Sequence, residues 1–108
     1  MASANPKRQV FRSNRLRQFA RGQSCVLCQG TEGFSSTVVL AHLPGSFYRM
    51  PAGIGQKTHD WLGAHLCAEH HARMDSEWRR DSQMRLMALC LTLERLFDEG
   101  VITVTKRC

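Results

Sequence analysis

The clearest hydrophobic pattern lies in the last third of the chain, from about Asp81 to Phe97. Apolar residues recur there every three or four positions, which is the spacing of one face of an α-helix. Gly100 follows the last of them, at a place where a helix C-terminus favours glycine. The pattern predicts a long helix, on whose apolar face we expect Cys90 to be a buried thiol. The residues of this face are Leu86, Leu89, Cys90, Leu93, Leu96 and Phe97.

Shorter apolar runs predict strands. Residues 37–43, TVVLAHL, are β-branched and apolar, with serine before them and Pro-Gly after them, which is typical of a short strand. Residues 62–66 predict a second strand, and residues 101–105 predict a terminal one. Between the first two strands, residues 44–58 contain two prolines and three glycines and predict a long loop.

Two more helices complete the predicted elements. Ser13 is a suitable N-cap for a short helix over Asn14 to Arg21, with Leu16 and Phe19 facing inward. Good helix formers follow Cys67 and predict a helix that starts just past it. The fold class is therefore α+β in one domain. We expect a basic N-terminal arm and short helix in 1–22, a core in 23–78, and a C-terminal helix and short strand in 79–108.

No segment of the 108 residues predicts export or a membrane span. The opening residues have no apolar core of the kind found in a signal peptide, and no run reaches the roughly 18 apolar residues of a membrane helix. We therefore expect a cytoplasmic protein with no membrane partner. Disulfides are disfavoured in that compartment, so closely spaced cysteines and histidines are interpreted first as metal ligands.

Two pairs of such residues stand at metal-ligand spacing, Cys25-x-x-Cys28 and Cys67-x-x-His70. Each pair presents two ligands from one turn, and together they supply the four donors of a tetrahedral structural zinc ion. A chain this short buries only a small core, which gives limited stability. Binding of a metal ion during folding would compensate for that. The alternatives are a redox CxxC motif and unpaired thiols that only pack.

The formal net charge is +6, and it is concentrated near the N-terminus. A basic arm of this kind favours a polyanion such as nucleic acid, although a solvated tail that aids solubility is an open alternative. Six basic residues precede the first acidic residue, Glu32, and they are Lys7, Arg8, Arg12, Arg15, Arg17 and Arg21.

The succession of a Cys-x-x-Cys knuckle, a strand ending in His42, a loop, a second strand and a helix opening with Cys67-Ala-Glu-His70-His71 resembles a known family. It is similar to the ββα-metal fold of His-Asn-His (HNH) endonucleases, with His70 in place of the second cysteine of the helix. The runs VVLAHL and GIGQKTHDWLGAHLCAEHHARMD are most similar to small phage and prophage nucleases of the YbcO type and to phage recombination-enhancement (Ref) nucleases. The resemblance covers roughly residues 25–75.

The resemblance implies a DNA endonuclease with structural zinc and catalytic magnesium or manganese. It implies that His42 is the general base, and that His71 and Asp75, four residues apart on one helix face, bind the catalytic ion. Two features depart from the family, because Ala41 precedes His42 where an Asp or His is common, and the middle Asn is absent. Asp60, or His59 beside it, lies near the place of that Asn and is a candidate for orienting the loop or completing the metal shell.

Structural roles are the alternatives at each of these positions. His42 could be satisfied within its strand, Asp75 could be a solvent-facing acid, and His59 and Asp60 could cap a helix or a turn. Trp61 and Trp78 are interpreted as packing residues. We expect the nucleic-acid-binding residues to be Arg12, Arg15, Arg17, Arg21, Lys57 and Arg73.

Three functional hypotheses follow. The first is a metal-dependent endonuclease on DNA, single- or double-stranded, acting in phage or prophage recombination or DNA processing with phage or host recombination proteins as partners. The second is a noncatalytic zinc-stabilised nucleic-acid-binding or adaptor module. The third is a homodimer through the C-terminal helix that works mainly through a partner.

Overall fold

The computed structural model describes residues 11–28, 37–43 and 59–105. At its centre is a two-stranded antiparallel sheet of β1 (Val39–His42) and β2 (Gly63–Leu66). The register pairs Val39 with Leu66 and His42 with Gly63. The sequence predicts both strands, and both are shorter than predicted.

Gly63 allows the two strands to approach closely. A Cβ atom at this position would lie 2.9 Å from two side-chain carbons of Leu40, which is closer than carbon atoms pack. The glycine follows η3 (Asp60–Leu62), a 3-10 turn that leads into β2. The sequence pattern does not predict this turn, and places the start of the strand at Leu62 instead.

Helix α1 (Asn14–Ala20) begins as its cap predicts, because the Oγ of Ser13 accepts a hydrogen bond from the Leu16 N–H at 3.2 Å. It ends one residue earlier than predicted. Leu16 and Ala20 are buried in it, and pack with Leu40 of β1.

Helices α2 (Ala68–Asp75) and α3 (Ser82–Asp98) also lie where they are predicted. Cys67 is the N-cap of α2, and Asp81 caps α3 by accepting from the Met84 N–H at 3.0 Å. Gly100 has a φ of +72°. The N–H of Val101 bonds the carbonyl of Leu96, which closes α3 with the glycine-dependent C-terminal motif that the sequence indicates.

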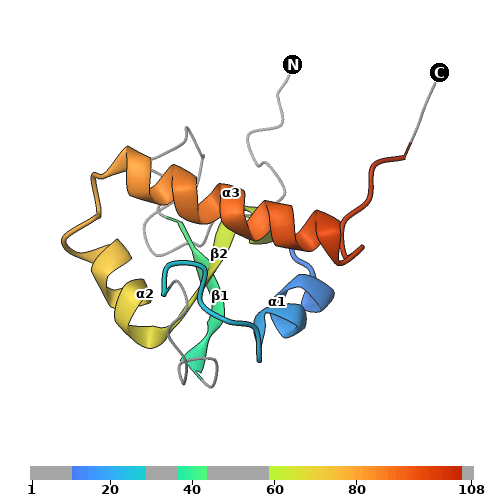
Figure 1. The fold of residues 1–108 in the computed structure, drawn as a ribbon, viewed down its shortest axis with the longest axis horizontal. Helices are drawn as coiled ribbons and strands as arrows, with labels where there is room; N and C mark the ends of the chain where they lie inside the picture. The colour runs from blue at the N-terminus through green and yellow to red at the C-terminus, as the bar shows by residue number, and fades with distance from the viewer. Residues whose placement is uncertain (1–10, 29–36, 44–58, 106–108) are drawn as a thin grey trace, which may run out of the picture.

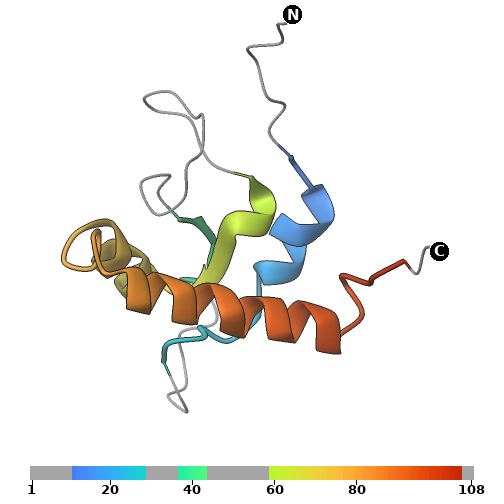
Figure 2. The ribbon, with the colours of Figure 1, turned by 90° about the horizontal axis from the view of Figure 1, so that it is seen from above.

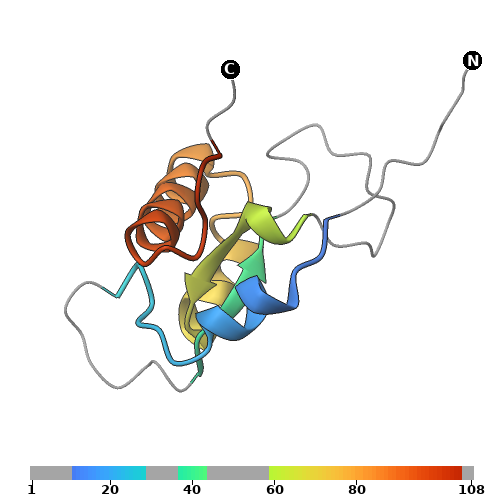
Figure 3. The same cartoon turned by 90° about the vertical axis from the view of Figure 1, so that its right-hand side faces the viewer.

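The helices surround the sheet on different sides. Figures 1 and 3 show α3 crossing one face of the sheet, and α1 and α2 flanking the strands. Seen from above in Figure 2, α1 and α2 lie toward opposite ends of α3. Helix α3 packs against β2, and α1 packs against β1. The core therefore lies on both sides of the sheet, and β2 is buried throughout.

The predicted phase of the α3 apolar face is wrong for several residues. The buried positions are Arg85, Ala88, Leu89, Thr92 and Leu96, whereas Cys90 is exposed. Small residues explain the rotation, because Ala88 and Thr92 let the helix approach β2 closely. The Oγ of Thr92 accepts from the His65 backbone N–H at 3.1 Å. As a result Leu86 and Phe97 remain about half exposed, at 51% and 46%.

The predicted terminal strand is also wrong. Residues 101–105 form bends and extended chain without sheet pairing. Val101 and Ile102 are partly buried against the cluster around Leu96 instead, just past the closure of α3. The predicted loop at 44–58, with Lys57 in it, lies outside the described residues. Among the described helices, none has the length and apolar character needed to cross a bilayer.

Candidate functional site

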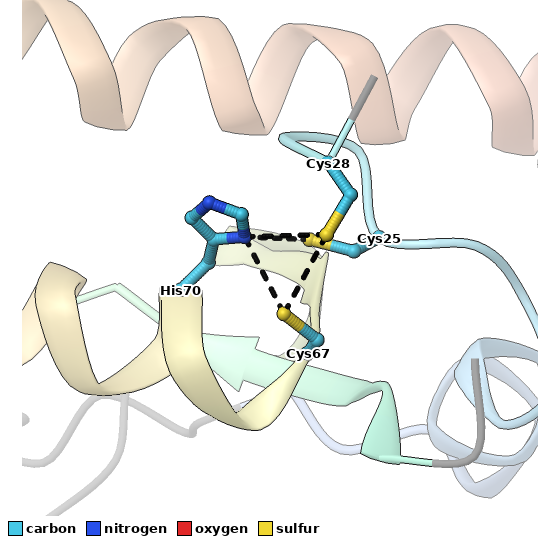
Figure 4. Close-up of side chains that lie close together, drawn as sticks. All are labelled: Cys25, Cys28, Cys67 and His70. Carbon is cyan, nitrogen blue, oxygen red and sulfur yellow. Dashed lines mark hydrogen bonds between the residues drawn. The ribbon is translucent and has the colours of Figure 1, made fainter. Parts of the chain in front are cut away.

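Four predicted metal ligands lie together at the start of α2. Cys25 and Cys28 come from the turn that follows α1, Cys67 is the N-cap of α2, and His70 lies in the first turn of that helix. Their four donor atoms are all within 4.8 Å of one another. Figure 4 shows the three sulfurs and Nδ1 of His70 directed at a common point. The cluster could therefore hold a metal ion such as zinc.

The separations between the donors fit a tetrahedral ion. Nδ1 of His70 lies 3.3 Å from Cys25 Sγ, 3.5 Å from Cys28 Sγ and 3.4 Å from Cys67 Sγ. The sulfurs of Cys28 and Cys67 are 3.7 Å apart. Zinc bond lengths of about 2.3 Å to sulfur and about 2.0 Å to nitrogen place tetrahedral donors about 3.5 to 3.8 Å apart. A disulfide would need sulfurs about 2.0 Å apart, and the described cysteines are free.

Two thiols of the cluster, Cys28 and Cys67, have pKa values shifted in opposite directions. Burial, with the neighbouring thiols of Cys25 and Cys67, raises the pKa of Cys28 to about 12. Burial also opposes ionisation of Cys67, but the backbone hydrogen bond at His70, the two other thiols and the backbone at Glu69 together lower its pKa. Cys67 is at a helix N-terminus, where a thiolate is favoured. A cation among the sulfurs would remove the cost of ionising the others.

Trp78 packs against the histidine of the cluster. Its ring stacks on His70, with centroids 6.0 Å apart and planes at 10°. The guanidinium of Arg73 lies 5.4 Å from the Trp78 ring centroid, and its Nε is 4.0 Å from a Glu77 carboxylate oxygen. Trp78 therefore has the packing role that its sequence context indicates. Arg73, predicted to bind nucleic acid, lies on the metal-cluster side of α2.

A separate pocket of about 450 Å³ opens between α1, β1 and α2. His42 at the end of β1 lines it, and so do His71 and Asp75 from α2. The structure thus brings together three of the predicted catalytic and metal residues, from segments 29 positions apart. The pocket is also lined by Asn14, Arg17, Gln18, Arg21, Val39 and Leu40.

His42 is held by a buried carboxylate. Its Nε2 is 2.7 Å from Oδ1 of Asp60, whose exposed fraction is 1%. Asp60 Oδ2 accepts from the Ser13 N–H and from Arg17, both at 2.5 Å, and Arg12 lies 3.4 Å from Oδ1. Asp60 therefore joins the start of α1 to the end of β1. Its side chain caps no turn beside it, but it does accept from the backbone of Ser13, the N-cap residue of α1, which is close to the helix-capping alternative.

Asp60 is ionised in this setting. Burial opposes its ionisation, but the hydrogen bonds of His42 and Ser13 and the charge of Arg17 lower the pKa of its carboxyl group. Because the folded value lies below the ordinary 3.8, the stabilisation is fully present above about pH 5. It is lost as the pH falls through the lower folded value.

His71 and Asp75 offer a more open pair of donors. Nε2 of His71 and Oδ2 of Asp75 are 3.6 Å apart, and their side chains are 39% and 58% exposed. The four-residue spacing places both on one face of α2, as predicted. The pair presents one nitrogen and one oxygen donor at the pocket, and both side chains are open to water.

His59 and His65 have structural partners. Nδ1 of His59 accepts from the Phe11 N–H at 2.8 Å, and its ring stacks on Trp61. His59 therefore holds the arm against η3. His65 is fully buried, and burial and the charge of Arg95 lower its pKa to about 4. Arg95 NH1 lies 3.0 Å from its Nδ1, so a neutral His65 accepts that bond inside the core.

The predicted nucleic-acid-binding arginines separate in the structure. Arg17 and Arg21 line the pocket with His42, whereas Arg15 lines a different hollow beside Glu99. Arg12 lies against Asp60. Asn14 and Gln18 also line this pocket from α1, and they are not among the residues predicted from the sequence. Their spacing with Arg17 and Arg21 is a helical i, i+3, i+4, i+7 pattern that could have identified them.

Comparison of the chain with protein-family models, with curated proteins and with solved structures gave no match.

Proposed function

We propose that this chain is a metal-dependent DNA endonuclease of the HNH type, which hydrolyses phosphodiester bonds at the pocket shared by His42 and His71. One observation carries the proposal. A histidine held by a buried carboxylate lines the same pocket as a histidine–aspartate pair able to hold a divalent ion. A base and a metal-binding pair in one cavity are the parts that phosphodiester hydrolysis needs.

The element order supports an HNH-like ββα-metal core. Two antiparallel strands precede a helix, with His42 at the end of the first strand and the Cys/His cluster at the start of the helix. Zinc is the proposed ion of that cluster, because three sulfurs and one nitrogen are a donor set typical of structural zinc. Its role would be to hold the knuckle at residues 25–28 against α2.

Asp60 prepares His42 to act as a base. An ionised carboxylate only accepts hydrogen bonds, so Nε2 of His42 carries the proton of the bond between them. Nδ1 of the neutral ring is then free of a proton and can take one from a water molecule. Asp60 fixes the orientation of the ring and stabilises the positive charge that forms on it, as a carboxylate does in hydrolase triads.

His71 and Asp75 are the residues that would hold magnesium or manganese. When bound, such an ion supplies positive charge that stabilises the phosphate and the departing oxygen. The chain's own basic residues contribute to binding, since the formal net charge is +6 and contacts to phosphates position a strand without reading its sequence. By its resemblance to phage nucleases, the protein would act in recombination or DNA processing.

A noncatalytic nucleic-acid-binding or adaptor module is the rival function, and one observation favours it. Among the described residues, the Cys/His cluster is the only group of three or more such donors close enough to hold a metal ion. Ala41 stands where the family commonly has another ligand, so the proposed catalytic ion would depend on two protein donors.

A plasmid-nicking assay separates the two functions. Purified protein is incubated with supercoiled plasmid and magnesium or manganese, and nicked circles are expected. A chelator that removes the added ion should abolish nicking, since two donors hold such an ion weakly. Bound plasmid that stays supercoiled with either metal would favour the noncatalytic module.

A further inference from the structure

One side of α1 forms a wall of the pocket. Asn14, Arg17, Gln18 and Arg21 line the cavity from this helix and its C-cap, opposite His71 of α2. Two positive charges therefore border a cavity whose other side carries the proposed metal-binding pair. The two arginines differ in what they contact, and this difference assigns them different tasks.

The guanidinium of Arg17 binds other residues of the protein. It bonds Asp60 Oδ2 at 2.5 Å, and its second nitrogen donates to the side chain of Asn14 at 3.3 Å. Asp60 is buried and needs a cation, because an unpaired buried carboxylate costs several kcal/mol. The charge of Arg17 is thus largely neutralised by Asp60. If Arg17 turned to a ligand, the buried carboxylate of Asp60 would lose this partner.

The side chain of Arg21 differs from that of Arg17 in its contacts. Its backbone N–H bonds the Gln18 carbonyl at 3.2 Å, which fixes where its side chain starts. Its guanidinium makes no hydrogen bond or ion pair with any part of the chain that the structure describes, and the residue is exposed. A free guanidinium at the rim of a pocket beside a base offers paired donors that match phosphate oxygens.

We propose that Arg21 binds a phosphate of the nucleic-acid strand that enters this pocket, while Arg17 acts as a positioning residue for Asp60 and Arg15 takes no part. The inference rests on the proposed function for the identity of the strand. Because the contact is to phosphate, it holds the strand regardless of sequence. Arg21 lies about 6 Å along the helix axis from Arg17, one turn further on.

Binding of fluorescein-labelled DNA, single-stranded and duplex, tests the assignment by anisotropy without added magnesium or manganese. Arg21→Ala should weaken binding at least about tenfold, because it removes a charge-assisted hydrogen-bonding contact to phosphate. It should also lower the slope of log affinity against log salt by about one. Arg21→Lys should recover most of the affinity, because it restores the charge.

Arg15→Ala is the matched control. It removes the same charge from the same helix, but Arg15 borders the hollow beside Glu99, so we expect less than about a twofold loss. Both variants should melt like wild type, because both side chains are exposed. Equal losses in Arg21→Ala and Arg15→Ala would overturn the inference, as would failure of wild type to bind DNA.

The outcome is distinguishable from that of the nuclease proposal. If binding depends on Arg21 but plasmid is never nicked, Arg21 binds phosphate as proposed and the nuclease proposal is wrong. If plasmid is nicked and Arg21→Ala binds and cuts as well as wild type, the nuclease proposal is supported and the assignment of Arg21 is wrong.

Discussion

Replacing Cys25 with alanine is expected to unfold the protein at ambient temperature, as is removal of the proposed zinc ion by a strong chelator. The Cys25 side chain belongs to the main core cluster and to the four-donor site. Structural zinc contributes about 10 to 16 kcal/mol in small zinc-binding peptides. Whole domains are stable by only about 5 to 15 kcal/mol. Loss of the ion would therefore remove about as much free energy of folding as a whole domain has.

Circular dichroism during thermal melting, with zinc present and after chelation, measures this effect. Cys90→Ser is the control, because Cys90 is exposed on α3 and outside the cluster. It should melt like wild type and lose its cooperative transition on chelation in the same way. A Cys25→Ala variant with the melting temperature of wild type would show that the four donors do not stabilise the fold.

Replacing His42 should remove cleavage and leave the fold intact. General-base catalysis contributes about 100-fold to 10,000-fold to rate, so His42→Ala should nick plasmid at least about 100-fold more slowly than wild type. His42→Gln is the sharper variant. Its amide can donate to Asp60 in place of Nε2, which keeps the buried carboxylate paired, but it cannot take a proton from water.

The first-order rate of plasmid nicking checks the prediction. Zinc content and circular dichroism are measured on the same samples to show that each variant is folded and loaded with zinc. Both His42 variants should bind DNA as wild type does, because the base contributes to the reaction and not to holding the strand. If His42→Gln cuts as fast as wild type while folded and zinc-loaded, His42 is not the base. An equal loss of binding and of rate would instead indicate a structural role at the end of β1.

Much of the fold follows from local patterns. Ser13 and Asp81 cap helices where their side chains predict it, and Gly100 adopts the positive φ of a helix end. The two Cys/His pairs also come together as their spacing indicates. Each of these features depends on a few neighbouring residues or on a ligand set of fixed geometry, so a single sequence is enough to predict it.

The features that the sequence does not predict depend on contacts between residues far apart in sequence. Asp60 bonds Ser13 and Arg17, 47 and 43 positions away, and nothing near Asp60 indicates an arm docked against it. Cys90 and Leu89 fit a helical apolar face equally well by spacing. Only the approach of Thr92 to β2 decides that Cys90 points outward. The terminal strand predicted for residues 101–105 is wrong for a similar reason, because Val101 and Ile102 pack against the cluster around Leu96 and do not pair with the described sheet.

X-ray absorption at the zinc edge, with metal content per chain, tests the central claim most directly: that one ion clamps the 25–28 turn to α2 and so places His42 and His71 around one pocket. We predict one zinc ion per chain, with three sulfurs at about 2.3 Å and one nitrogen at about 2.0 Å. A folded chain that carries no metal ion, or whose ion has a different set of ligands, would contradict it.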